Sequence, residues 1–197
     1  MTGAPSGETP EATILVCDDK NDTREAIISY LDFEGFEVRR AENGEQALEM
    51  IKESQPDLVL LDGMMPGMDG LDVLKTIRTT AETSYLPVIM VTARGDTSDV
   101  ARALKSGATD YLVKPVQLEL LVSRVRTALR LADLEADRRA LQERLKRLNI
   151  LTDLTLQVVG VEGSEPVRRA AEEMRALIAE LLRLESERDQ VADTLTD

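Results

Sequence analysis

Five short strand-like runs, most of them apolar, alternate with segments of helical spacing from Thr13 onward. Continuous apolar runs of this length are typical of parallel strands that are buried on both faces of a sheet. The alternation therefore predicts an α/β fold, a doubly wound five-stranded parallel sheet with helices on both faces. The predicted strands are Thr13–Cys17, Phe36–Arg40, Leu58–Leu61, Pro87–Val91 and Asp110–Val113.

Reactive or charged side chains stand at the ends of four of these runs. Asp18 and Asp19 follow the first run, Asp62 follows the third, Thr92 the fourth and Lys114 the fifth. Because the carboxyl ends of parallel strands share one edge of the sheet, where ligands bind in such folds, we expect these residues to form one site.

Three carboxylates at one edge would repel each other and raise one another's pKa unless a cation lay among them. Mg²⁺ prefers oxygen ligands and keeps several waters, so Asp18, Asp19 and Asp62 can supply two or three of its ligands. We therefore expect Mg²⁺ as the cofactor, with Mn²⁺ able to replace it.

Asp62 ends the central run and is the expected nucleophile, because a carboxylate that attacks phosphorus forms an aspartyl phosphate. Lys114 can supply positive charge to the transferring group, and Thr92 can donate a hydroxyl hydrogen bond to it. The chain contains no histidine, which excludes a phosphohistidine of its own and histidine-based catalysis. The phosphoryl group must come from a separate donor.

The combined motif resembles the receiver domains of bacterial response regulators over about residues 12–130. The resemblance implies a flavodoxin-like sheet of order 2-1-3-4-5, phosphorylation of Asp62, and a histidine kinase or phosphotransfer protein as donor, contacting residues near 21–28 and the loop after Lys114. It also implies that the receiver catalyses its own phosphoryl transfer and hydrolysis and is not otherwise an enzyme. The segments that carry it are ILVCDD, LVLLDGMMPGMDGLDVL, PVIMVTA and GATDYLVKP.

The same resemblance assigns roles to single residues. Asp18, Asp19 and Asp62 would bind the metal together with the backbone carbonyl of Met64. Thr92 and Tyr111 would report the phosphorylated state. Lys114 would pair with the acidic cluster, and the peptide bond before Pro115 would be cis.

The region after the receiver has a different pattern. Residues 117–159 contain neither glycine nor proline, and Gly160, Gly163 and Pro166 follow. We predict a disordered stretch at 1–11, a receiver domain at 12–130, and a helical coiled coil or hairpin at 131–197 with a break near 160–166. Two stripes of apolar residues at heptad a and d positions, one seam on each predicted helix, support this prediction. They are Leu131, Leu134, Leu141, Leu145 and Leu148, then Val167, Ala170, Met174, Leu177, Leu181, Leu184, Val191 and Leu195.

These seams leave three arrangements open. The second helix can fold back as a hairpin in a monomer, two hairpins can form a four-helix bundle, or both helices can run on as a parallel coiled coil. We expect a homodimer through the C-terminal helices, whose arrangement transmits the state of Asp62. The alternative is the regulatory half of a longer enzyme, such as a diguanylate cyclase or a phosphatase.

Charge and hydropathy set further expectations. The net charge is −13 and the basic clusters are interleaved with acidic residues, so we expect no direct nucleic-acid binding. No apolar run approaches the roughly 18 residues of a membrane span, so we expect no membrane insertion. The single cysteine and the absence of a signal peptide fit the cytoplasm.

Overall fold

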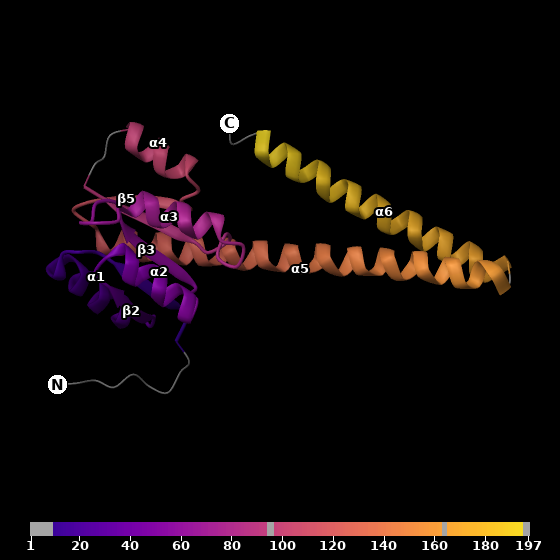
Figure 1. Cartoon of the computed structure of the whole chain (residues 1–197), viewed down its shortest axis with the longest axis horizontal. Coiled ribbons are helices and arrows are strands. Elements are labelled where there is room, and N and C mark those ends of the chain that lie inside the picture. The colour runs from indigo at the N-terminus through magenta and orange to yellow at the C-terminus, as the bar shows by residue number, and fades with distance from the viewer. Residues whose placement is uncertain (1–9, 94–96, 163–164, 195–197) are drawn as a thin grey trace. The chain divides into compact units, whose positions relative to one another are not determined.

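A computed structural model describes residues 10–93, 97–162 and 165–194. In these ranges strands and helices alternate, and two long helices follow (Figure 1). The strands are β1 (Thr13–Cys17), β2 (Glu37–Ala41), β3 (Leu58–Asp62), β4 (Val88–Thr92) and β5 (Asp110–Val113). The helices are α1 (Asn21–Phe33), α2 (Gly44–Glu53), α3 (Gly70–Thr79), α4 (Thr97–Lys105), α5 (Leu118–Glu162) and α6 (Glu165–Thr194).

The strands form one parallel sheet of order β2-β1-β3-β4-β5, which confirms the predicted flavodoxin-like fold. The central strand β3 pairs with β1 and β4, and its last residue, Asp62, is in register with Val91. Strands β2 and β4 each begin one residue later than predicted. Phe36 precedes β2, because its backbone N–H donates to the carbonyl of Leu31 and closes α1.

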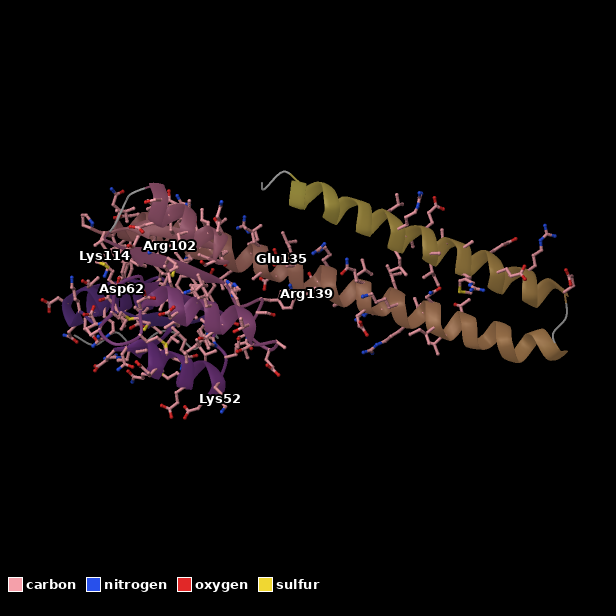
Figure 2. All side chains as sticks on the ribbon, turned by 45° about the horizontal axis from the view of Figure 1, so that its top comes forward. Lys52, Asp62, Arg102, Lys114, Glu135 and Arg139 are labelled. Atoms are coloured by element: carbon pink, nitrogen blue, oxygen red, sulfur yellow. The ribbon has the colours of Figure 1, made fainter. Side chains whose placement is uncertain are left out.

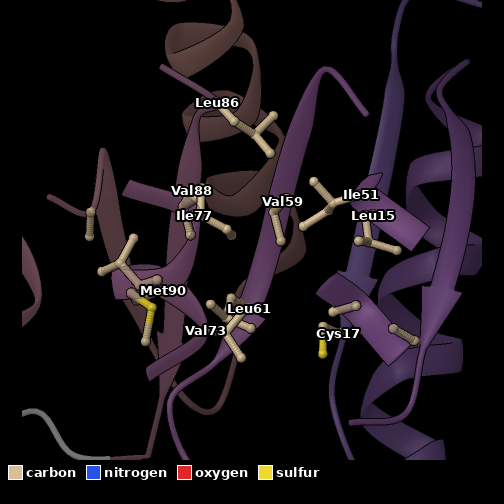
Figure 3. Packing of buried hydrophobic residues seen from close by; sticks show 14 of the residues in the cluster. Leu15, Cys17, Ile51, Val59, Leu61, Val73, Ile77, Leu86, Val88 and Met90 are labelled. Carbon is tan, nitrogen blue, oxygen red and sulfur yellow. The ribbon is translucent and has the colours of Figure 1, made fainter. Parts of the chain in front are cut away.

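Side chains that alternate along the strands form two apolar layers, one on each face of the sheet. Leu15 and Cys17 belong to a layer that also contains residues of α2, α3 and α4, whereas Ile14 and Val16 belong to a layer with residues of α1 and α5. Figure 3 shows part of the first layer, with Val59, Leu61, Val88 and Met90 beside one another. Burial on both faces explains why β1, β3 and β4 read as continuous apolar runs.

The start of α3 lies unusually close to the end of β3. A Cβ atom added to Gly70 would lie 2.1 Å from the carbonyl oxygen of Asp62, so only glycine fits there. Asp69 caps the helix, because its side chain accepts a hydrogen bond from the backbone N–H of Asp72. The loop after β3 is thereby held against the carboxyl edge of the sheet.

The chain divides into two compact units, Met1–Asp133 and Leu134–Asp197. The predicted domain boundaries stay predictions, and residues 1–9 of the expected disordered stretch lie outside the described residues. Helix α5 continues through Gly160, where a helical glycine costs only about 1 kcal/mol. Pro166 is the second residue of α6, a position where its missing N–H has no helical acceptor. Gly163 lies outside the described residues.

Four of the five leucines in the seam of α5 are exposed in this chain, and Leu145 is half-buried. Leu131, Leu134, Leu141 and Leu148 retain between 47% and 61% of their accessible surface. The seam of α6 is similar, with Met174, Leu177, Leu181 and Leu184 between 41% and 60% exposed. The side chains of Val167, Val191 and Leu195 lie outside the described residues. The choice among a hairpin, a four-helix bundle and a parallel coiled coil stays a prediction.

Membrane crossing finds no support in these helices, since none of those described has a sufficiently long apolar stretch.

Candidate functional site

Three aspartates meet at the carboxyl edge of the sheet. Asp18 and Asp19 directly follow β1, and Asp62 is the last residue of β3. Their ligand oxygens lie within 4.8 Å of one another, and the Asp18 and Asp62 residues are only 2% and 4% exposed. The acidic cluster expected from the sequence is therefore present.

Lys114 joins this cluster from the residue after β5. Its Nζ donates hydrogen bonds of 2.7 Å to Oδ2 of Asp18 and of 2.7 Å to Oδ2 of Asp62. Figure 2 shows Lys114 and Asp62 next to each other. The backbone N–H of Lys114 donates to the carbonyl of Thr92, which anchors the loop to β4. The peptide bond from Lys114 to Pro115 is cis, as predicted.

The electrostatics of the cluster reflect its burial. Desolvation raises the pKa of Asp62 above its ordinary value, although the hydrogen bond from Lys114 acts in the opposite direction. Desolvation lowers the pKa of Lys114, but its hydrogen bonds to Asp18 and Asp62 outweigh that effect and leave its pKa raised. Lys114 therefore stays charged beside a carboxylate that is costly to keep ionised.

One carboxylate oxygen of the cluster has no hydrogen-bond partner in the part of the chain that the structure describes. Asp19 Oδ1 is buried without a hydrogen bond among the described residues. The other carboxylates are partly satisfied, because Asp18 Oδ1 accepts from the backbone N–H of Lys20 at 2.8 Å and Asp62 Oδ1 from that of Met64 at 3.2 Å. An orphaned carboxylate oxygen within an all-oxygen set fits a hard divalent cation. That the backbone carbonyl of Met64 also binds the metal stays a prediction.

Thr92 and Tyr111 border the same site. Both residues, with Asp19 and Met64, line a cavity of about 510 Å³ beside the cluster. Gly63 keeps this edge open, since a Cβ atom there would lie 3.3 Å from Oγ1 of Thr92. Thr92 and Tyr111 thus face the cavity beside the cluster, and their roles in reporting phosphorylation stay predictions.

Sequence reasoning did not single out Arg24. This residue is 4% exposed and donates a hydrogen bond of 2.7 Å to the backbone carbonyl of Asp18. An arginine in the first turns of a helix normally reads as a solvated residue. The position of Arg24 shortly after the aspartate pair was the one hint in the sequence. Only the fold shows that its side chain points toward the site.

Comparisons with known proteins agree with this geometry. The family model described as "Response regulator receiver domain" matches residues 14–126. "Response regulator MprA" of Mycobacterium ulcerans is 40% identical over 156 residues, which are 79% of this chain and 65% of that protein. "DNA-binding response regulator MtrA" of Mycobacterium tuberculosis is 44% identical over 126 residues, 64% of this chain and 54% of that protein.

Solved structures show the same likeness. The crystal structure of a response regulator from Chloroflexus aurantiacus, described there as putative, has a TM-score of 0.59 at 40% identity and covers 61% of this chain and 98% of that one. NtrX of Brucella abortus has a TM-score of 0.62 at 33% identity and covers 66% of this chain and 29% of that one. The chain thus spans 54% to 65% of the curated relatives described above.

These relatives contradict one expectation. The prediction of no direct nucleic-acid binding is wrong as an inference from charge, because MtrA, at 44% identity, is named a DNA-binding response regulator. Net charge averages over a whole chain, whereas contact with DNA depends on the local charge of one surface. A net charge of −13 therefore does not exclude such a partner.

Proposed function

The chain belongs to the response regulator receiver domain family, and we propose that it accepts a phosphoryl group on Asp62 from a histidine kinase or phosphotransfer protein in the cytoplasm. One observation carries the proposal. Asp62 shares a buried cluster with Asp18 and Asp19, and Lys114 bridges two of these carboxylates at 2.7 Å each. A carboxylate that attacks phosphorus needs positive charge beside the transferring group, which a cation and a lysine can supply.

The chemistry follows from these groups. Asp18, Asp19 and Asp62 would hold a Mg²⁺ ion, whose positive charge would stabilise the transferring phosphoryl group. A carboxylate oxygen of Asp62 forms a bond to phosphorus while the bond from phosphorus to the donor's leaving atom breaks. Lys114 moves its hydrogen bond from the carboxylate to a phosphoryl oxygen, and the hydroxyl of Thr92 donates to another.

Intact-protein mass spectrometry tests this proposal. Incubation with acetyl phosphate and Mg²⁺ should add one phosphoryl group to the chain and release acetate. Addition of EDTA should prevent the gain, and Asp62→Asn should abolish it while the variant keeps its circular dichroism spectrum. Full labelling of Asp62→Asn would contradict the assignment.

The donor protein is proposed to dock beside Asp62, at α1 and the loop after Lys114. Thr23, Ala26 and Ile27 of α1 and Pro115 and Val116 of the loop line a shared cavity of about 220 Å³. A shallow apolar depression next to the phosphoacceptor suits an apolar side chain of the donor. Exchange of residues 21–28 for those of another receiver should change which kinase phosphorylates the chain. An unchanged preference would contradict the proposed dock.

The proposed output is a homodimer of the helical segment, modulated by phosphorylation. The support is the exposed apolar residues of the two seams. An exposed apolar surface of this kind is typical of an interface. Charge supports a second copy as the partner. Residues 138–147 contain five basic residues and one acidic residue, and residues 180–189 contain four acidic and two basic residues. A twofold interface must be self-complementary, and a surface with both signs meets that condition.

A second candidate output is DNA binding, which the name of the relative MtrA favours. Fluorescence anisotropy of a labelled duplex, titrated with the phosphorylated and unphosphorylated chain, tests it. Binding should strengthen on phosphorylation and weaken steeply with salt, as counterion release requires. Equal anisotropy with and without the chain at low salt would contradict this output.

A further inference from the structure

Arg24 is a buried charge that the phosphotransfer chemistry leaves unexplained. It is the fourth residue of α1, and its side chain is 5% exposed, although arginine is seldom buried unless it is paired. Its backbone N–H donates to the carbonyl of Lys20 at 3.0 Å, which ties the start of α1 to the loop after β1. The start of α1, and with it Arg24, is thus joined to the loop that carries the first two aspartates.

Three hydrogen bonds fix this guanidinium. Nη1 donates to the backbone carbonyl of Asp18 at 2.7 Å. Nη2 donates to Oδ1 of Asn21 at 3.0 Å and to Oε1 of Glu42 at 3.1 Å. One planar group thus connects the loop after β1, the first turn of α1 and the residue that follows β2, with the geometry that a rigid arginine fork provides.

The bond to Asp18 has a direct consequence for the acidic cluster. The carbonyl that Arg24 holds belongs to the peptide unit that joins Asp18 to Asp19. Fixing the direction of that carbonyl fixes the peptide plane, and with it the points from which both side chains leave the backbone. Asp18 and Asp19 supply two of the three carboxylates of the cluster. The positive charge of Arg24 also offsets part of the repulsion among them.

Stability alone does not account for the burial of Arg24. Its Nε is buried without a partner among the described residues. A buried, unsatisfied N–H costs free energy that a better-matched apolar side chain would avoid. Glu42, one of its acceptors, has a side chain that is 66% exposed, so that ion pair adds little. The short bond to the Asp18 carbonyl is the contact that remains to be explained.

We propose that Arg24 is a positioning residue of the divalent-metal site, which sets the orientation of the Asp18–Asp19 peptide and so the affinity for the cation. The inference rests on the proposed function, because it requires that the acidic cluster bind a divalent metal. Groups that orient metal ligands from outside the ligand set typically change affinity by about 10-fold to 100-fold when they are removed. The three hydrogen bonds of the Arg24 guanidinium go to Asp18, Asn21 and Glu42 and not to the nucleophile Asp62, so its effect should appear in metal affinity before any chemistry.

Titration with Mn²⁺, followed by the electron paramagnetic resonance of the free ion, tests the proposal without a phosphodonor. Arg24→Ala should weaken Mn²⁺ binding by about 10-fold or more. Arg24→Lys, which keeps the charge and one donor but loses the fork, should lie between this variant and the wild type. Urea unfolding of the metal-free proteins measures the loss of stability separately.

Arg78 provides the matched control. Like Arg24, it is hydrogen-bonded to the backbone, since Nε donates to the carbonyl of Gly107 at 2.7 Å and Nη1 to that of Leu86 at 2.8 Å. Those carbonyls precede β5 and β4, at the opposite edge of the sheet from the aspartates. Arg78→Ala should lower the free energy of unfolding and leave Mn²⁺ affinity unchanged.

The outcomes separate the proposals. Wild-type affinity in Arg24→Ala, or an equal loss in Arg24→Ala and Arg78→Ala, would overturn the role of Arg24. If Arg24→Ala does not fold, the comparison of Arg24→Lys with Arg78→Ala decides, and wild-type affinity in Arg24→Lys overturns it. A wild-type chain that binds no Mn²⁺ would instead contradict the metal site of the proposed function.

Discussion

At the scale of single residues, Asp62 carries a conflict between stability and chemistry. Burial raises its pKa in the folded chain, so the folded state binds its proton more tightly than the unfolded state does. The native state therefore gains stability from Asp62 as the pH falls through that raised pKa, and at neutral pH the ionised carboxylate costs stability. A nucleophile must nevertheless be ionised to attack phosphorus.

Asp62→Asn should consequently raise the free energy of unfolding of the metal-free chain at neutral pH, and a gain of about 1 kcal/mol would raise Tm by several degrees. The difference from the wild type should shrink as the pH is lowered through the pKa of Asp62. Thermal unfolding in EDTA at a series of pH values measures this. A variant less stable than the wild type at neutral pH would show that the bond to Lys114 outweighs the cost of burial.

Gly70 offers a second test at this scale. A Cβ atom there would lie 2.1 Å from the carbonyl oxygen of Asp62, so Gly70→Ala must push the end of β3 or the start of α3 aside. We expect a loss of roughly 1–3 kcal/mol in stability and slower labelling by acetyl phosphate. Gly35→Ala is the control, because nothing lies within 4 Å of a Cβ atom there, although its φ of 95° makes that substitution strained as well. If both variants label at the same rate, the close approach does not position Asp62.

At the scale of elements, the sequence predicted the strands well because burial on both faces gives a strand a continuous apolar run. It also predicted that Asp18, Asp62 and Lys114 would meet, since parallel strands end at one edge. It could not predict Arg24, whose burial depends on how α1 crosses the sheet. It misplaced the start of β2, because Phe36 belongs to the turn that closes α1.

The seam of α5 provides the test for the helical elements. Leu141→Asp with Leu148→Asp should dissociate the proposed dimer, because each leucine contributes about 1.5–3 kcal/mol when it is buried. Ile150→Asp is the control, since Ile150 is 59% exposed and lies outside the heptad frame of these leucines. Sedimentation velocity of the three proteins distinguishes the effects. Loss of the dimer in Ile150→Asp alone would place the interface on a different face of α5.

At the scale of the whole molecule, the heptad pattern predicted two long helices but not what covers them. An apolar seam in a sequence does not say whether its partner is the same chain or another one. Most of the described leucines of both seams are exposed in the single chain. Light scattering should give a dimer for the full chain and a monomer for residues 1–130. A full-length monomer at tens of micromolar would contradict the proposed homodimer, and a dimer of residues 1–130 would place the interface on the receiver.

The central claim is that Asp62 is the residue that becomes phosphorylated. Borohydride reduces an aspartyl phosphate to homoserine, so treatment of the acetyl phosphate-labelled chain marks the modified position permanently. Tandem mass spectrometry of the resulting peptides should find homoserine at position 62 only when Mg²⁺ and the donor are both present. Homoserine at another aspartate, or an unmodified Asp62 in a folded chain under these conditions, would contradict the account.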